Sequence, residues 1–224
     1  QEVISLTVRQ CRATPLKNQT VQTNTISNVT PDFSVKTPLK YRKTGEINLP
    51  FETKAHMYKL SNGQKVIIVP NDGETVVKTY VNTGSMNEPD KLRGISHYIE
   101  HNLFNGSEGL EAGEFFKTTD KMGAETNAST GLAETNYYIS SYLLNDGDLE
   151  KKIKIHASML ETPRFAADML FKEKGIVNSE INMITSNPEN IAFNRTLKNL
   201  FSIKTKSSDI IAGTTDNITN LSGE

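Results

Sequence analysis

Hydrophobic and polar residues alternate through the middle of the chain, a pattern typical of β-strands. Residues 56–60 and 65–70 form two short apolar runs, and the loop between them contains Asn62-Gly63, a dipeptide that favours β-hairpins. Residues 75–83 are rich in β-branched side chains that alternate in character, and they predict a third strand. Two further strands are predicted at residues 125–130 and 135–144.

Between and after these strands, apolar residues recur at helical spacing. Helices are predicted at residues 95–104, at 112–122 with Gly123 as the C-terminal cap, at 148–160, at 166–185, and from Pro188 to about residue 201. Hairpin-connected strands come first and helices dominate later. We therefore predict an α+β fold with a mostly antiparallel sheet packed against several helices.

The first 45 residues differ from the rest of the chain. They contain eight threonines and three prolines and show no sustained periodicity. We expect an extended leader or linker at 1–45 and a folded domain at 46–224, because a polar stretch buries too little surface to offset its ordering entropy. Inside the leader, residues 3–8 alternate and predict one strand, which could pair with a partner outside the chain.

The end of the chain carries a helix start without a helix. Ser222 is a candidate N-cap with the acidic Glu224 in the first turn, and the sequence stops there. This indicates a domain truncated at its C-terminus, and a frayed natural terminus is the alternative.

Composition excludes several classes of protein. Lys and Arg total 25 against 26 Asp and Glu, for a net charge of -1, which argues against a dedicated nucleic-acid binder. The longest aliphatic run covers residues 66–69, far short of the roughly 18 apolar residues that cross a bilayer. Cys11 is the only cysteine, so one chain cannot form a disulfide framework or a cysteine-ligated zinc site. A metal site would have to use His, Asp and Glu.

The segment at residues 94–104 is where such a site is predicted. His97 and His101 are four residues apart, so on a helix their imidazoles lie on one face and can bind one metal ion. Glu100 can reach the same side, and the pattern is the inverted zinc-protease motif H-x-x-E-H. Neutral imidazoles suit zinc, and a neighbouring carboxylate can accept a proton from water. The alternative is a surface helix with two solvated histidines.

A catalytic zinc site needs a third protein ligand, and Glu173 and Glu180 are the candidates. They are seven residues apart, about two helical turns, and so face the same way. The alternative is that both acids face solvent, as is common on long helices. Gly175 suggests close packing or a bend. An apolar stripe would seat this helix against the core: Ile176, Val177, Ile181 and Ile184.

With these motifs, the chain resembles the pitrilysin/insulinase family of zinc metallopeptidases, which includes the mitochondrial processing peptidases. The similarity covers roughly residues 54–224, the zinc-binding half of a two-part clamshell, and leaves residues 1–45 outside. It rests on several segments that follow one another in the family's order: the hairpin at 60–70, Gly84-Ser85 with Glu88-Pro89, the H-x-x-E-H motif and its continuation to Gly106, the stretch at 123–130, and the glutamates at 173 and 180. Two positions depart from the family pattern, Asn102 and Ser179.

The resemblance assigns roles to individual residues. It implies that zinc is bound by His97, His101 and Glu180, with Glu100 as the general base. It makes Glu173 a supporting catalytic acid that orients a ligand or assists proton transfer. Asn127 and Ala128 would lie on an edge strand that pairs with the extended substrate; ordinary sheet pairing is the alternative for that strand.

The function implied is a zinc-dependent endopeptidase that hydrolyses peptides or unfolded polypeptides. Family enzymes use a second half, so we expect a partner: the C-terminal half of the same polypeptide or a related subunit, without which this piece has little activity. The alternative is a non-catalytic scaffold or interaction subunit of the same fold. A module that binds metal without hydrolysis fits poorly, because Glu100 is not needed to hold zinc. The Thr/Asn-rich leader and the absence of an initiator Met favour an exported bacterial protein over a mitochondrial or cytoplasmic one.

Overall fold

The computed structural model of the chain describes residues 3–8, 39–201 and 209–221. Seven strands in these ranges form a single sheet with the order β2-β3-β4-β1-β5-β7-β6. Neighbouring strands are antiparallel except for β1 and β4, which are parallel. The strands are β1 (Val3–Val8), β2 (Tyr41–Asn48), β3 (Lys54–Leu60), β4 (Lys65–Ile68), β5 (Thr75–Val81), β6 (Glu125–Thr130) and β7 (Thr135–Ser141).

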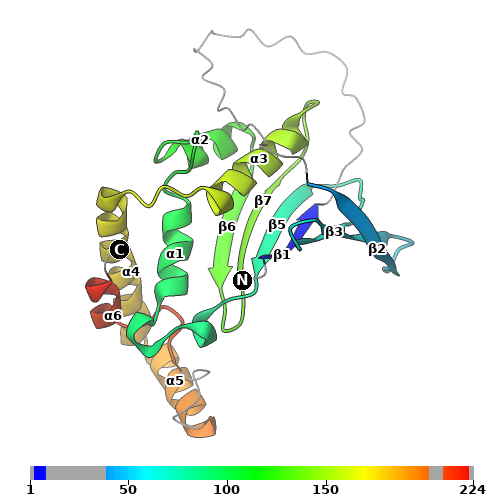
Figure 1. Cartoon of the computed structure of the whole chain (residues 1–224). Helices are drawn as coiled ribbons and strands as arrows, with labels where there is room; N and C mark the ends of the chain where they lie inside the picture. Colours follow the sequence, from blue (N-terminus) through cyan, green and yellow to red (C-terminus); the bar gives the residue numbers. More distant parts are fainter. Residues whose placement is uncertain (1–2, 9–38, 202–208, 222–224) are drawn as a thin grey trace.

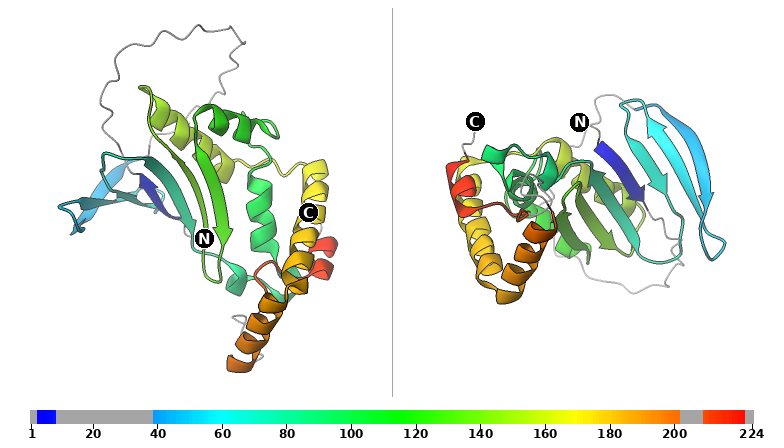
Figure 2. Two further views of the ribbon diagram at one scale, coloured as in Figure 1. Left: turned by 180° about the vertical axis from the view of Figure 1, so that it is seen from behind. Right: turned by 90° about the horizontal axis from the view of Figure 1, so that it is seen from below.

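Helices cover the end of the sheet that contains β5, β6 and β7, whereas β2 and β3 project from the other end (Figures 1 and 2). α3 contacts β5 and β7, and α1 lies between β6 and α4. α4 in turn carries α5 and α6. The helices are α1 (Ile95–Leu103), α2 (Glu114–Lys121), α3 (Asp148–Glu161), α4 (Ala167–Ser186), α5 (Pro188–Leu200) and α6 (Thr215–Asn220), with short 3-10 turns η1 (Ser85–Asn87) and η2 (Asp90–Leu92).

The predicted α+β class with a mostly antiparallel sheet is confirmed. Each strand and helix predicted between residues 56 and 201 is present, with ends that move by a few residues. Two elements were not predicted. β2 is exposed along most of its length, so it lacks the alternation of a half-buried strand, and it crosses the expected boundary at 45–46. α6 is too short to show helical periodicity.

The N-terminal strand was predicted correctly but its partner was not. β1 pairs with β4 and β5 inside the sheet of its own chain rather than with an outside partner. The candidate helix start at Ser222 and the cysteine Cys11 lie outside the described residues.

The core is divided into two clusters on either side of α1. The first, here the sheet-side cluster, joins strands to helices, and the second, the helix-side cluster, joins α1 to α4, α6 and the segment before α6. The sheet-side cluster contains Leu103, Leu110, Phe115, Tyr137, Ile139, Ile155 and Met159. The helix-side cluster contains Tyr98, Val177, Ile181, Ala212, Ile218 and Leu221. Because α1 contributes Leu103 to one and Tyr98 to the other, both clusters determine where it lies.

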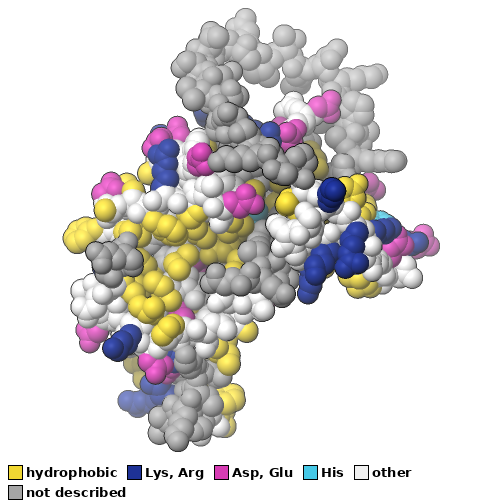
Figure 3. Space-filling view, in the orientation of Figure 1, with side chains coloured by type: hydrophobic (Ala, Val, Ile, Leu, Met, Phe, Trp, Pro, Cys, Tyr) yellow, Lys and Arg dark blue, Asp and Glu magenta, His cyan; other side chains and the backbone are white. Residues whose placement is uncertain are grey.

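Hydrophobic and basic side chains are distributed unevenly over the surface of the molecule. Hydrophobic side chains gather over the helices in the view of Figure 3, whereas Lys and Arg side chains gather over β2 and β3. Phe171 of α4 is 80% exposed and Phe165, just before α4, is 40% exposed. Extended apolar surface of this kind marks interaction sites more often than free surface. Among the described residues, none of the helices is both long enough and apolar enough to cross a membrane.

Candidate metal centre

Three predicted metal ligands converge between α1 and α4. The ligand atoms of His97, His101 and Glu180 all lie within 4.8 Å of one another. The Nε2 atom of His97 is 3.7 Å from Oε1 of Glu180, and Nε2 of His101 is 3.4 Å from Oε2 of the same carboxylate. Two atoms bound to a tetrahedral zinc at about 2.0–2.1 Å lie about 3.4 Å apart. The three side chains therefore fit a divalent cation without a large rearrangement.

The electrostatics of the site also suit a metal. Burial lowers the pKa of His97 below its ordinary value, while the charge of Glu180 acts in the opposite direction. His97 is consequently neutral at pH 7, the form in which imidazole binds metal ions. Imidazole nitrogens with one carboxylate are a donor set typical of catalytic zinc.

Glu100 lies next to the ligands and is buried, with 9% of its surface exposed. The hydroxyl of Thr130, at the end of β6, donates a hydrogen bond to Oε2 of Glu100. Both residues line the same cavity as His97 and Glu180. A carboxylate so placed can accept a proton from a water in that cavity.

Glu173 lies behind His101 rather than among the ligand atoms. Its buried carboxylate is 3.3 Å from Nδ1 of His101, and it accepts a hydrogen bond of 3.0 Å from the amide of Asn105. An acid that bonds one ring nitrogen of a histidine fixes the ring and makes the other nitrogen a better metal ligand. The geometry thus separates the two candidate glutamates: Glu180 faces both histidines as a candidate ligand, and Glu173 contacts His101 from the other side of its ring.

α4 is seated against the core by a narrower stripe than predicted. Val177 and Ile181 are buried and Ile184 packs against them, but Ile176 is 43% exposed and does not belong to the stripe. Gly175 also differs from the expectation of close packing, because a Cβ at this position would have no atom within 4 Å apart from the adjoining backbone of α4. α4 continues through it without interruption.

At both departures from the family pattern the side chain donates a hydrogen bond to the backbone of its own helix. Ser179, beside Glu180, bonds back to the carbonyl of Gly175 at 2.8 Å. Asn102 is buried and its Nδ2 donates to the carbonyl of Tyr98 at 2.7 Å, whereas its buried side-chain oxygen has no hydrogen-bond partner among the described residues. Neither side chain is among the three candidate ligands.

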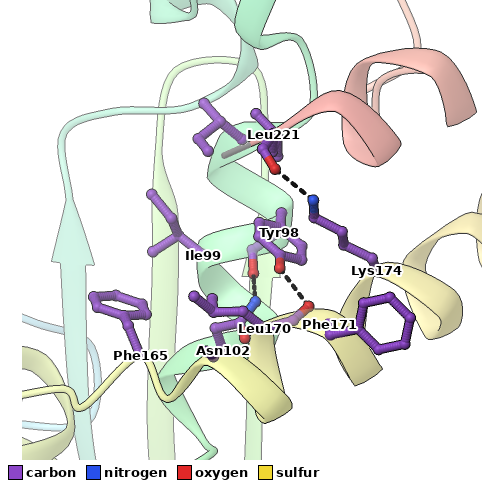
Figure 4. A pocket seen from close by; sticks show the side chains of 10 residues that line it. Tyr98, Ile99, Asn102, Phe165, Leu170, Phe171, Lys174 and Leu221 are labelled. Atoms are coloured by element: carbon purple, nitrogen blue, oxygen red, sulfur yellow. Dashed lines mark hydrogen bonds between the residues drawn. The ribbon is translucent and has the colours of Figure 1, made fainter. Parts of the chain in front are cut away.

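Asn102 lines a second hollow, of about 360 Å³, which is mostly apolar (Figure 4). Here the Tyr98 hydroxyl donates to the carbonyl of Leu170 and Lys174 donates to that of Leu221. These bonds fasten α1 and the end of α6 to α4. The hollow contains none of the candidate metal ligands, so we regard it as part of the helix packing.

The predicted substrate residues lie on β6, the last strand of the sheet. Asn127 is exposed and Ala128 half-buried, and the side-chain oxygen of Asn127 accepts from the backbone N–H of Ala128 at 2.8 Å. That amide is therefore directed away from β7. Ala128 also lines a cavity of about 750 Å³ that is lined as well by His97, Glu100 and Glu180 and by Phe193 and Leu197 of α5.

Two residues at the site and one beside it were missed by sequence reasoning. Thr130 bonds Glu100, Asn105 bonds Glu173, and the buried Glu88 accepts from the backbone N–H groups of Gly94 and Ser96 at the start of α1. Thr130 is 30 residues from its partner in the sequence and Asn105 is 68 from its own. Contacts over such separations leave no periodic pattern that a single sequence could reveal.

Comparison with known proteins agrees with this geometry. Residues 66–214 match the insulinase family, peptidase family M16. The uncharacterized zinc protease YmfH of Bacillus subtilis is 30% identical over 175 residues, which are 73% of this chain and 39% of that protein.

Solved structures show the same fold. A protease from Helicobacter pylori superposes with a TM-score of 0.70 at 27% identity, over 76% of this chain and 41% of its own. Pitrilysin superposes with a TM-score of 0.68 at 19% identity, over 80% of this chain and 19% of its own, and so shares the fold. The chain spans less than half the length of each of these proteins.

Proposed function

This chain belongs to the insulinase family, peptidase family M16, and from that premise we propose that it is the zinc-binding part of a zinc endopeptidase. The substrates would be peptides or unfolded polypeptides. The observation that carries the proposal is the convergence of His97, His101 and Glu180 within 4.8 Å of one another, beside a cavity that Glu100 also lines. The name of YmfH as a zinc protease supports the choice of metal.

In the proposed mechanism His97, His101 and Glu180 hold zinc, and Glu173 keeps the ring of His101 in place through Nδ1. When bound, zinc supplies Lewis acidity that makes a water acidic near neutral pH and polarises the substrate carbonyl. Glu100 accepts the proton from the attacking water and then passes it to the leaving amine. Thr130 directs the Glu100 carboxylate through its hydroxyl.

The substrate would bind as an extended strand along β6. An edge strand offers backbone groups that pair with any peptide, so main-chain hydrogen bonds give affinity with little sequence demand. The outward N–H of Ala128 is one such group, and the peptide would have to displace the Asn127 side chain that now accepts from it. Asn127 and Ala128 are therefore proposed as substrate-binding residues.

We also propose that the active enzyme needs more polypeptide than this chain. Family relatives are more than twice as long as the matched segment, and the helices expose apolar surface around Phe165 and Phe171. The missing part would be a C-terminal half of the same polypeptide or a related subunit. Adding that part in trans should raise peptide cleavage by this chain, and an unchanged rate would contradict the idea.

The test of the proposed function is metal analysis of the full-length protein together with peptide digestion with and without a chelator. We expect about one zinc per chain and cleavage that the chelator abolishes. Glu100→Gln should keep the zinc and lose about 10²–10⁴-fold in kcat, the range for a general base. Full activity in Glu100→Gln would show that the base is misassigned. A zinc content near zero would favour the non-catalytic scaffold.

A further inference from the structure

Glu88 is a buried carboxylate that lies outside the metal centre but is bonded to the helix that carries it. It is 3% exposed and follows the short turn η1. Its Oε2 accepts from the backbone N–H of Gly94 and its Oε1 accepts from that of Ser96, both at 2.8 Å. Both carboxylate oxygens are thus engaged at the first turn of α1.

The start of α1 needs such a partner from elsewhere in the chain. Its N-cap residue is Gly94, which has a φ of 89° and no side chain to accept from the first amides. A Cβ at Gly94 would lie 2.3 Å from the carbonyl oxygen of Ala212, so a Ser, Thr or Asp cap does not fit there. A negative charge at a helix N-terminus also interacts favourably with the helix dipole.

The loop that carries Glu88 is in turn bonded to the turn between β6 and β7. The N–H of Ser85 donates to the carbonyl of Gly131 at 3.1 Å, and the N–H of Met86 donates to that of Leu132 at 2.8 Å. Gly131 directly follows Thr130, the residue bonded to Glu100. Glu88 therefore completes a chain of hydrogen bonds that links the turn after β6 to Ser96, the residue before His97.

From this arrangement we propose that Glu88 is a positioning residue that sets where α1 lies relative to β6. It would thereby place His97, Glu100 and His101 against the substrate strand and against Glu180 of α4. Glu88 is not itself a candidate ligand, and it acts through the backbone of Gly94 and Ser96. The inference rests on the proposed metal-binding role of α1.

The chain offers a control for the loss of a carboxylate that accepts two backbone N–H groups near the start of a helix. Asp148 at the start of α3 accepts from the N–H groups of Leu144 and Asn145 at 2.9 and 2.8 Å through Oδ2. α3 carries no candidate metal ligand. Glu88→Gln and Asp148→Asn each remove one charge and keep the size of the side chain, and they act at different helices; Glu88 is buried, whereas Asp148 is only half-buried.

The experiment measures the zinc dissociation constant of the metal-stripped full-length protein by competition with a chelator, together with Tm. We expect Glu88→Gln to raise the dissociation constant about tenfold, at the lower end of the effect of losing a partner outside the ligand set. Glu88→Asp, which keeps both oxygens on a shorter stem, should lie between it and the parent. Asp148→Asn should lower Tm and leave zinc binding unchanged. A dissociation constant for Glu88→Gln within twofold of the parent would overturn the inference.

Hydrogen exchange of the metal-free protein gives a second readout that does not depend on zinc. Glu88→Gln should speed exchange at the amides of residues 97–101 and leave α3 unchanged, whereas Asp148→Asn should do the reverse. Equal acceleration in both helices would mean that Glu88 only stabilises the fold. If Glu88→Gln does not fold, zinc affinity and hydrogen exchange of Glu88→Asp decide whether Glu88 positions α1. A parent protein without zinc affinity would contradict the proposed function, while the exchange data would still test Glu88.

Discussion

The sheet-side cluster joins β7 to α1, α2 and α3, whereas the helix-side cluster joins α1 to α4, α6 and the segment before α6. The two sides bring different chemistry to α1. From the helix side come the carboxylates of Glu173 and Glu180, which face the histidines. From the sheet side comes the hydroxyl of Thr130, which bonds Glu100. The packing therefore separates the proposed metal binding, to which α4 contributes Glu180, from the placement of the proposed base, Glu100, to which β6 contributes Thr130.

The largest expected effect comes from truncating one core residue on each side. Ile181→Ala and Ile139→Ala remove buried side chains that are 2% and 0% exposed, and each should lower the free energy of unfolding by about 3 kcal/mol. Only Ile181→Ala should also weaken zinc binding, by about tenfold, because Ile181 seats the helix that carries Glu180. Urea unfolding and chelator competition measure the two quantities. Equal zinc affinities in the two variants would show that the separation between the sides is false.

The next effect is a dependence of stability on pH that arises on the sheet side. Burial lowers the pKa of His156 in α3 to about 4, and Thr79 of β5 is its hydrogen-bond partner at 2.8 Å. The unfolded chain protonates this histidine near pH 6.5 and the folded chain only near pH 4, so stability falls as the pH falls through that window.

For the metal-free protein, His156 should contribute a loss of about 2 kcal/mol in unfolding free energy between pH 7 and pH 5. His156→Gln should remove this part of the pH dependence. The comparison is made by urea unfolding of parent and variant at both pH values. The same pH dependence in the variant would assign the effect to other groups.

A smaller effect is expected from the hydroxyl that reaches Glu100. Thr130→Val keeps the shape of the side chain and removes the hydrogen bond, so kcat should fall about tenfold, equivalent to about 1.4 kcal/mol, with zinc content and KM unchanged. Thr130→Ser should restore most of the rate. Thr135→Val, which removes from β7 a hydroxyl that donates to the carbonyl of Thr83, is the control. Loss of zinc in Thr130→Val would contradict the division of roles.

The smallest effect tests the helix side alone. Gly175 lies inside α4, and a Cβ there would meet no atom within 4 Å apart from the adjoining backbone of the helix. Gly175→Ala should therefore raise the free energy of unfolding by up to about 1 kcal/mol. Zinc affinity should stay the same or rise slightly. A drop in Tm would mean that α4 needs the backbone conformational freedom of glycine at position 175.

Local patterns predicted much of this architecture. The buried faces of β5 and β7 place Val77 opposite Ile139, as the alternation of apolar residues predicts. The four-residue spacing of His97 and His101 likewise predicted that both lie on one face of a helix, α1. β2 was missed because an exposed edge strand needs no hydrophobic face. α6 was missed although Thr214 caps it by accepting from the N–H of Asn217, since six residues are too few for periodicity.

The site itself was only partly predictable. Spacing placed Glu173 and Glu180 on one side of a helix but did not say which of them meets the histidines, because that depends on how α4 packs against α1. Only the family resemblance separated their roles. Glu88 and Thr130 act across turns and between elements, so their partners became visible only in three dimensions.

The identity of the ligands can be decided by locating the metal in crystals of the zinc-loaded protein, with anomalous scattering at the zinc edge. We predict one strong peak per chain, between the imidazoles of His97 and His101 and the carboxylate of Glu180, with Glu173 outside bonding distance. A peak bound by Glu173 in place of Glu180, or no peak between α1 and α4, would contradict this assignment.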